Sequence, residues 1–261
     1  MGERHMKKLG LQLWTIRDVF KTEDEVKHAF FELAKYGYHE VETAGFPIAP
    51  EKFAEYAKEA GLEIVNTHYS WDEIENNLDK TIEFHKMLGT KYIGIGGLCN
   101  RFKSKDELIR HAHLFNEIGE KMAEHCYKFT YHNHSLEFQK YDGKTWYSYL
   151  MDIMDGRYTC LELDTYWAQH GGMDVCALLR KLAGKTEIIH LKDMAAHFAP
   201  DKENPDITEI GNGNLNFEDI IPLAESLRVE HFIVEQDRNW RVSPLESARE
   251  SAAYLKEHFG F

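Results

Sequence analysis

Hydrophobic and polar positions along this chain repeat with two different periods. Short apolar runs rich in Ile, Val, Leu and Tyr have the character of buried β-strands. Longer segments follow them with an apolar residue every three or four positions, as in Val26, Ala29, Phe30 and Leu33, and with charged residues between. The pattern therefore predicts strands that alternate with amphipathic helices along the whole chain.

Eight strand–helix pairs are predicted in this way. The strands are expected at residues 8–13, 38–43, 63–68, 91–96, 127–132, 159–164, 187–191 and 231–235. The helices are expected at residues 23–36, 50–60, 72–88, 105–125, 145–154, 174–182, 217–227 and 244–258. Thr22 and Ser104 each stand three residues before a Glu, as in a capping box, and Gly37, Gly61 and Gly89 follow three of the helices.

This order implies an α/β protein with a parallel sheet, because helices separate the strands and no hairpin signal joins them. Eight pairs favour closure of the sheet into a (β/α)8 TIM barrel, with an open doubly wound sheet as the alternative. We expect one domain over residues 7–261 and interpret residues 1–6 as the remnant of an expression tag. Residues 194–216, rich in Pro, Asn, Asp and Gly, are expected to form a lid or a binding loop.

The charge balance narrows the choice of partners. Lys and Arg number 31 and Asp and Glu 44, so the formal charge is −13, which argues against a nucleic-acid partner. No apolar run reaches the ~18 residues of a membrane span. The four cysteines are too widely spaced for a thiolate metal site. We expect a cytoplasmic protein, although a signal peptide removed for expression would leave the same start.

Polar residues gather at the ends of the predicted strands, where the active sites of barrels lie. Six strands end in the segments Glu40-Val41-Glu42, Asn66-Thr67-His68, His132-Asn133-His134, Glu162-Leu163-Asp164, His190-Leu191-Lys192-Asp193 and Glu235-Gln236-Asp237. Asp164, His190 and Glu235 end three successive strands, and burying such groups unpaired costs roughly several kcal/mol per ion. A divalent cation (Mn, Co, Zn or Mg) held by His and carboxylate ligands would remove that cost.

Some of these positions also have a purely structural interpretation. The three strand-end residues just named could form ion pairs with neighbouring side chains. His132 could pack against the barrel wall, which would leave His134 or Glu137 as the fourth ligand. Glu162 is expected to support a neighbour such as Lys192 rather than to bind a metal ion. Asp193 is expected to orient His190 or Lys192 rather than to react.

Positions around the expected barrel mouth are candidates for substrate binding. For Glu42 and His68, a substrate contact and a salt bridge at the barrel mouth are equally compatible with the sequence. Trp14 and Trp167 follow strand ends, where an indole ring can stack on the face of a sugar. Gly211-Asn212-Gly213 resembles a phosphate-binding loop only superficially.

Seven segments, taken in order, resemble the xylose-isomerase-like TIM-barrel superfamily. They are Leu9–Trp14 (LGLQLW), Gly37–Thr43 (GYHEVET), Tyr131–Phe138 (YHNHSLEF), Leu161–Ala168 (LELDTYWA), Ile189–Asp193 (IHLKD), Glu209–Gly213 (EIGNG) and Ile233–Glu235 (IVE). That superfamily includes sugar isomerases and epimerases, inosose dehydratases and an endonuclease branch. The resemblance spans the chain from about Lys7 onward.

The resemblance implies a divalent metal held by Glu, Asp, His and Glu from the fifth to eighth strands. Asp164, His190 and Glu235 match that pattern, whereas His132 stands where the first Glu is usual. Trp167 stands where some epimerases place a His, so the substrate specificity is expected to differ.

The leading hypothesis is a metal-dependent sugar isomerase or epimerase that forms an enediolate from a keto-sugar or an aldose. Glu235 would act as ligand and base, and His132, His134 or Lys192 would move or stabilise the proton on the opposite face. One alternative is a lyase or dehydratase of a keto-sugar, keto-glycoside or keto-cyclitol. Another is a sugar-binding barrel without catalysis.

Two further expectations concern partners. The endonuclease branch is disfavoured by the charge of −13 and by the absence of additional His–carboxylate sets. A small-molecule sugar is the expected partner. Tyr69, Trp71 and Phe102 are compatible both with the pocket and with a subunit contact in a homo-oligomer.

Overall fold

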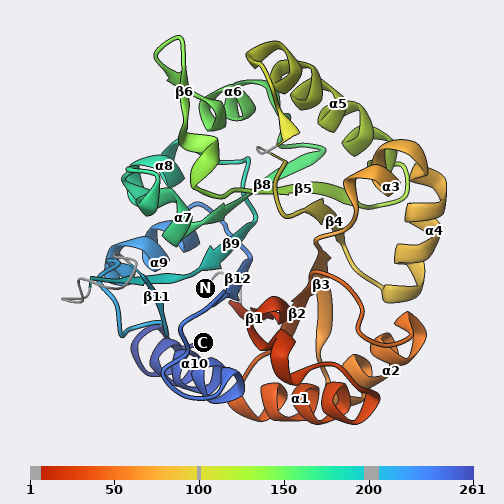
Figure 1. The fold of residues 1–261 in the computed structure, drawn as a ribbon, viewed down its shortest axis with the longest axis vertical. Coiled ribbons are helices and arrows are strands. Elements are labelled where there is room, and N and C mark those ends of the chain that lie inside the picture. Colours follow the sequence, from red (N-terminus) through yellow and green to blue (C-terminus); the bar gives the residue numbers. More distant parts are fainter. Residues whose placement is uncertain (1–6, 99–100, 197–205) are drawn as a thin grey trace, which may run out of the picture.

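A computed structural model describes residues 7–98, 101–196 and 206–261, and it shows a nearly closed barrel of parallel strands (Figure 1). The barrel strands are β1 (Lys8–Gln12), β2 (Glu40–Thr43), β3 (Glu63–Thr67), β4 (Tyr92–Ile95), β5 (Lys128–His132), β8 (Thr159–Asp164), β9 (Ile188–Leu191) and β12 (His231–Val234). Their order is β3-β2-β1-β12-β9-β8-β5-β4. A bridge between His68 and Gly94 connects the two ends of this order. The predicted (β/α)8 fold is confirmed.

Helices surround the strands on the outside of the barrel, as Figure 1 shows. They are α1 (Glu23–Tyr36), α2 (Pro50–Ala60), α3 (Trp71–Asn76), α4 (Leu78–Leu88), α5 (Lys105–Ala123), α6 (Trp146–Ile153), α7 (Thr165–His170), α8 (Val175–Lys181), α9 (Phe217–Ser226) and α10 (Pro244–Phe259). Two 3-10 turns, η1 (Leu13–Val19) and η3 (Ser135–Phe138), follow β1 and β5. None of the helices in the described ranges has the length and apolar character of a membrane span.

Local sequence signals explain most of the helix ends. Thr22 caps α1 in a complete capping box with Glu25. Gly37 ends the same helix in the left-handed conformation, with φ of 99°, which costs glycine little because it has no Cβ. At α5 the box is incomplete, because the Glu107 carboxylate accepts from the N–H of Lys103, one residue before the cap.

The structure corrects two expectations about the connections. The helix predicted at 72–88 is two helices, since Asn77 leaves helical geometry between α3 and α4. Two antiparallel hairpins are present although none was predicted: β6 (Lys140–Tyr141) with β7 (Lys144–Thr145), and β10 (Asp193–Ala195) with β11 (Asp206–Thr208). The strands of the second hairpin lie mostly within residues 194–216, which were expected to form a lid or a binding loop. The remnant expected at residues 1–6 and the loop interior at 197–205 lie outside the described residues.

Inside the barrel, a close approach between β4 and β5 positions polar side chains. A Cβ on Gly94 would lie 1.6 Å from Thr130 Oγ1, so only glycine fits there. The Thr130 hydroxyl donates to Asn66 Oδ1 at 3.2 Å, and Asn66 in turn donates to Glu42 at 2.9 Å. The hydrogen bonds from Thr130 through Asn66 to Glu42 therefore run across the inside of the barrel.

Candidate active site

Four predicted metal ligands meet at the C-terminal ends of the last four barrel strands. His132 ends β5, Asp164 ends β8, His190 lies in β9 and Glu235 follows β12. One ligand atom from each lies within 4.8 Å of those of the other three, and all four residues are buried. Parallel strands bring these residues to one face of the barrel, and we call them the four-residue cluster.

Two imidazoles in the cluster have opposite electrostatic environments. His190 Nδ1 lies 2.9 Å from Glu235 Oε2, and its Nε2 lies 2.9 Å from Glu42 Oε1. Burial acts to lower the pKa of His190, but the surrounding carboxylates outweigh it and raise the pKa well above its ordinary value. His132 has Asp164 Oδ2 at 3.3 Å from its Nε2, and burial lowers its pKa to about 4. Its buried Nδ1 has no hydrogen-bond partner among the described residues.

Lys192 follows β9 and its ammonium group reaches the same cluster. Its Nζ lies 2.9 Å from Asp164 Oδ2, 2.7 Å from Glu235 Oε2 and 2.9 Å from Asp237 Oδ2. The side chain is only 1% exposed, so water screens these contacts little. Burial acts to lower the pKa of Lys192, but the three carboxylates hold it well above the ordinary value. Burial raises the pKa of Asp237 to about 6.

A second His–carboxylate group lies beside the cluster, and none was expected. Glu42, His68 and Glu162 join His190 in it, with His68 Nε2 3.0 Å from Glu42 Oε1 and 2.9 Å from Glu162 Oε2. Of the two interpretations of Glu42, its 0% exposure and its pairing with His68 favour the salt bridge over the substrate contact. Glu162 contacts His68, His190 and Asn66, so the neighbours that it supports differ from the Lys192 given as an example.

Aromatic and imidazole groups form the rim of the site. His134 is half-buried, and its ring lies 5.4 Å from that of Trp167. The Lys192 ammonium lies 5.5 Å from the Trp167 ring centre, so Trp167 borders the cluster. Trp14 is 46% exposed and stacks on the Arg17 guanidinium at 4.5 Å. The structure thus places His134 and Trp167 next to the cluster and leaves Trp14 partly exposed after the end of β1.

Gln12 and Asn66 are site residues to which the sequence analysis gave no role. Both are fully buried, and their side-chain amides donate to Glu42. On β1, Leu9 and Leu11 alternate with Gly10 and Gln12, which is the signal that marks an inward-facing position in a strand. On β3, Asn66 follows two consecutive apolar residues and the register with β2 is irregular, so no such signal marks it.

Asp193 binds the loop after β9 rather than orienting His190 or Lys192. Its carboxylate accepts from the backbone N–H groups of Met194, Gly211, Gly213 and Leu215, at 2.8 to 3.2 Å. The glycine pair that resembled a phosphate loop therefore binds an anion of the chain itself.

Replacing Asp193 with Ala is expected to lower the free energy of unfolding by roughly 3 kcal/mol or more, because four backbone donors lose a charged acceptor. Denaturant unfolding measures the change. Asp174→Ala is the control, since Asp174 caps α8 through one N–H and its loss costs about 1 kcal/mol. Equal losses for the two variants would contradict the role assigned to Asp193.

Glu137, the alternative ligand, is buried behind the cluster. Its Oε2 accepts from the His134 N–H at 2.8 Å and its Oε1 from the Tyr131 hydroxyl at 2.9 Å. Burial raises its pKa from 4.5 to about 7. Two protein donors already occupy the oxygens, so a ligand role for Glu137 has no support in this geometry.

The raised pKa of Glu137 predicts a pH dependence of stability. Between pH 4.5 and about 7 the unfolded chain loses this proton while the folded chain keeps it, so stability falls as the pH rises. The loss amounts to about 3 kcal/mol. In Glu137→Gln this fall is expected to disappear from urea unfolding measured between pH 5 and 8, whereas the exposed control Glu117→Gln keeps it. An unchanged slope in Glu137→Gln would refute the assignment.

The donor set of the four-residue cluster fits a divalent cation. Two imidazole nitrogens and two carboxylate oxygens converge, a mixed set that suits Mn, Co or Zn. His190 has a carboxylate behind its second nitrogen, as metal-binding histidines usually do. The unpartnered Nδ1 of His132 is a further buried polar atom available to a ligand.

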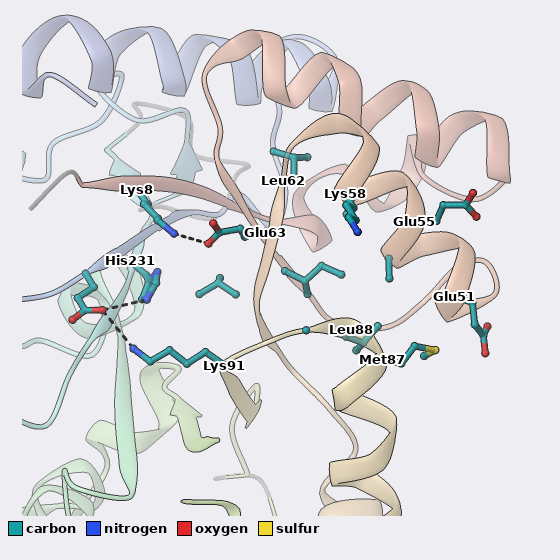
Figure 2. A pocket seen from close by; sticks show the side chains of 16 residues that line it. Lys8, Glu51, Glu55, Lys58, Leu62, Glu63, Met87, Leu88, Lys91 and His231 are labelled. Atoms are coloured by element: carbon teal, nitrogen blue, oxygen red, sulfur yellow. Dashed lines mark hydrogen bonds and ion pairs between the residues drawn. The ribbon is translucent and has the colours of Figure 1, made fainter. Parts of the chain in front are cut away.

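A cavity of about 800 Å³ lies at the other end of the barrel, where the strands begin (Figure 2). Lys8 and Glu63 pair at 2.5 Å on its wall, and His231 lies next to them. None of the cluster residues lines this cavity. In this fold the N-terminal face serves stability, so we assign no chemistry to it.

Comparison with known proteins agrees with this geometry. The family model described as xylose isomerase-like TIM barrel matches residues 30–258. An inosose dehydratase of Mesomycoplasma hyopneumoniae is 25% identical, over 94% of this chain and 93% of its own length. Another from Clostridium beijerinckii is 27% identical over 56% of this chain and 53% of its own.

Solved structures show the same fold. A sugar phosphate isomerase/epimerase of Parabacteroides distasonis superposes with a TM-score of 0.81 at 22% identity, covering 100% of this chain and 97% of that one. An L-ribulose 3-epimerase superposes with a TM-score of 0.71 at 14% identity, covering 97% and 94%. The matched model spans most of the barrel and the cluster lies within it, so this chain belongs to the xylose isomerase-like TIM barrel family.

Proposed function

We propose that this chain is a metal-dependent lyase acting on a keto-sugar, keto-glycoside or keto-cyclitol. It would remove the proton next to the carbonyl group and expel the oxygen substituent one carbon further on. The observation that carries the proposal is the contact of 2.7 Å between Lys192 Nζ and Glu235 Oε2 inside the four-residue cluster. A base and a proton donor are thereby held side by side.

His132, Asp164, His190 and Glu235 would hold the cation. When bound, it supplies stabilisation of negative charge on the substrate's carbonyl oxygen. The buried surroundings of the cluster strengthen this effect, because little water competes for the charge.

The proton steps fall to residues of the chain. Glu235 takes the α-proton, and the electron pair of the broken C–H bond forms the new C=C bond as the C–O bond breaks. Lys192 donates a proton to the departing oxygen, which leaves as water or as an alcohol. Asp237, 2.9 Å from Lys192, orients the ammonium group and can pass a proton back to it.

Elimination fits this arrangement better than epimerisation by two opposed carboxylates. Epimerisation requires proton transfer on both faces of one carbon, whereas Glu235 and Lys192 are in direct contact. Glu162, the other inward carboxylate of β8, is engaged by His68 and His190 and is 0% exposed. The curated relatives named inosose dehydratase support the same choice.

An isomerase or epimerase is the second candidate. His134 reaches the rim from β5, on a different strand from Glu235, and could serve the other face of a substrate. Both candidates begin by removing the same proton, so they share the cluster.

Incubation of the cation-loaded protein in D2O with a 3-keto-glycoside and with an inosose distinguishes the lyase from the isomerase or epimerase. An unsaturated ketone seen by absorbance and NMR supports the lyase. A stereoisomer or an aldose–ketose isomer that carries deuterium contradicts the lyase and supports the isomerase or epimerase. Binding without deuterium exchange of any substrate would overturn both and leave a sugar-binding barrel.

A further inference from the structure

We infer that Glu42 is a positioning residue that fixes the His190 ring so that Nδ1 of this imidazole faces the four-residue cluster; the inference rests on the proposed function. Glu42 lies on β2, across the barrel from the cluster strands, and is 0% exposed. It therefore acts only through the groups that surround it.

The two oxygens of Glu42 are surrounded by hydrogen-bond donors. Oε1 accepts from Gln12 Nε2 at 2.5 Å, and it lies 3.0 Å from His68 Nε2 and 2.9 Å from His190 Nε2. Oε2 accepts from Asn66 Nδ2 at 2.9 Å. We call Gln12, Asn66, His68 and Glu42 the Glu42 network.

Both amides in this network are held in one orientation. Gln12 Oε1 accepts from the Trp14 N–H at 3.2 Å, so its amide nitrogen points to Glu42. Asn66 Oδ1 accepts from the Thr130 hydroxyl at 3.2 Å, so its amide nitrogen also points to Glu42. The donors therefore cannot turn away without losing a second hydrogen bond.

The carboxylate oxygens beside Nε2 determine which His190 nitrogen can bind a cation. His190 Nε2 lies 2.9 Å from Glu42 Oε1 and 3.3 Å from Glu162 Oε1, so it keeps its proton when a cation binds, and the Nδ1 lone pair is the one left for the cation. A glutamine at position 42 would present an amide N–H₂ to the ring in one of its orientations. It would then favour the tautomer with the proton on Nδ1, the atom that faces the cluster.

The same geometry argues against a second cation between Glu42, His68, Glu162 and His190. Those four residues also offer ligand atoms within 4.8 Å of one another. However, the amide N–H groups of Gln12 and Asn66 already point at the Glu42 oxygens. Gln12 Nε2 also lies 3.5 Å from His68 Nδ1, which favours a proton on the opposite nitrogen, the one that faces Glu42 and Glu162. We therefore expect one cation per chain.

Cobalt(II) titration of the full chain, followed by visible absorption, tests the inference. Glu42→Gln is expected to weaken cobalt affinity 10- to 100-fold and to change the ligand-field bands, while Glu42→Asp recovers part of the affinity. Glu40→Gln is the matched control. Glu40 lies two residues earlier on β2, is equally buried and accepts from His231 Nδ1 at 2.8 Å, outside the cluster. Its variant is expected to bind cobalt as the unmodified protein does.

Unchanged affinity in Glu42→Gln, equal weakening in Glu40→Gln, or two bound equivalents would each overturn the inference. If the unmodified protein binds no cobalt, the proposed function fails by itself. The positioning role of Glu42 is then tested on metal-free protein through the ¹⁵N signals of His190. These signals are identified by their loss in His190→Asn. Movement of these signals in Glu42→Gln and not in Glu40→Gln supports the positioning role, and unmoved signals refute it.

Discussion

Replacing Asp164 with Asn is expected to remove the divalent cation from the purified protein and to abolish substrate proton exchange. The carboxylate oxygen Oδ2 of Asp164 faces both His132 and Lys192, and an amide in its place carries no charge for the cation. Its other oxygen caps α7 by accepting from the Trp167 N–H at 2.8 Å. Since Asn is also a good N-cap, the fold should survive the change. The affinity for the cation is expected to fall by roughly 100-fold or more. That loss is at least as large as the largest seen when a residue that hydrogen-bonds to a metal ligand is changed.

Elemental mass spectrometry of protein purified without chelator measures this loss. Asp152→Asn is the control, because Asp152 is an exposed residue of α6 paired with Lys144. Chelator treatment of the unmodified protein should abolish proton exchange, and Mn or Co should restore it. A folded Asp164→Asn protein with its full metal content would remove Asp164 from the site.

Replacing Lys192 with Met is expected to stop catalysis and, in contrast to the first variant, to tighten cation binding. The ammonium group lies 2.9 Å from Asp164 and 2.7 Å from Glu235, two of the four cluster residues, so it repels a cation bound there. Without it the rate should fall by about 10²- to 10⁴-fold, the usual contribution of a general acid. The metal-free variant should lose roughly 3–5 kcal/mol of stability, because the buried carboxylates of Asp164 and Glu235 and the partly buried one of Asp237 lose their partner.

Thermal unfolding with and without saturating Mn, together with metal titration and product formation, follows these changes. Added Mn should raise the unfolding temperature of Lys192→Met more than that of the unmodified protein. Lys91→Met, which removes an exposed lysine paired with Glu230, serves as the control. Weaker metal binding in Lys192→Met would show that the lysine supports the cluster rather than competing with the cation. Full activity would remove Lys192 from the mechanism.

The order of the barrel strands and of the longer helices could be read from the sequence because each of these elements carries a local signal. Apolar periodicity located α1 and α2 at their observed bounds, and Thr22 and Gly37 marked the two ends of α1. The break at Asn77 and the hairpins β6–β7 and β10–β11 were missed. These short elements have too few residues for a periodic pattern, and long-range contacts decide their geometry.

The candidate ligands could also be predicted, since Asp164, His190 and Glu235 are placed by the strand ends that carry them. The partners of Glu42, Asp193 and Lys192 could not. Glu42 and His190 are 148 positions apart and meet only because the barrel closes. The contact of Asp193 with Gly211 and Gly213 likewise depends on how the loop returns to the barrel.

The eight strand–helix pairs, and the acidic and imidazole side chains at the ends of the strands, can be derived from the residue pattern alone. Those properties follow from local periodicity and from the alternation of side chains along a strand. Which of these charges face one another depends on how the barrel closes. The tertiary structure places Lys192 among three carboxylates, and it surrounds Glu42 with donors from β1, β3 and β9. The reason is physical: in a buried site, the cost of each charge depends on neighbours that distant strands provide.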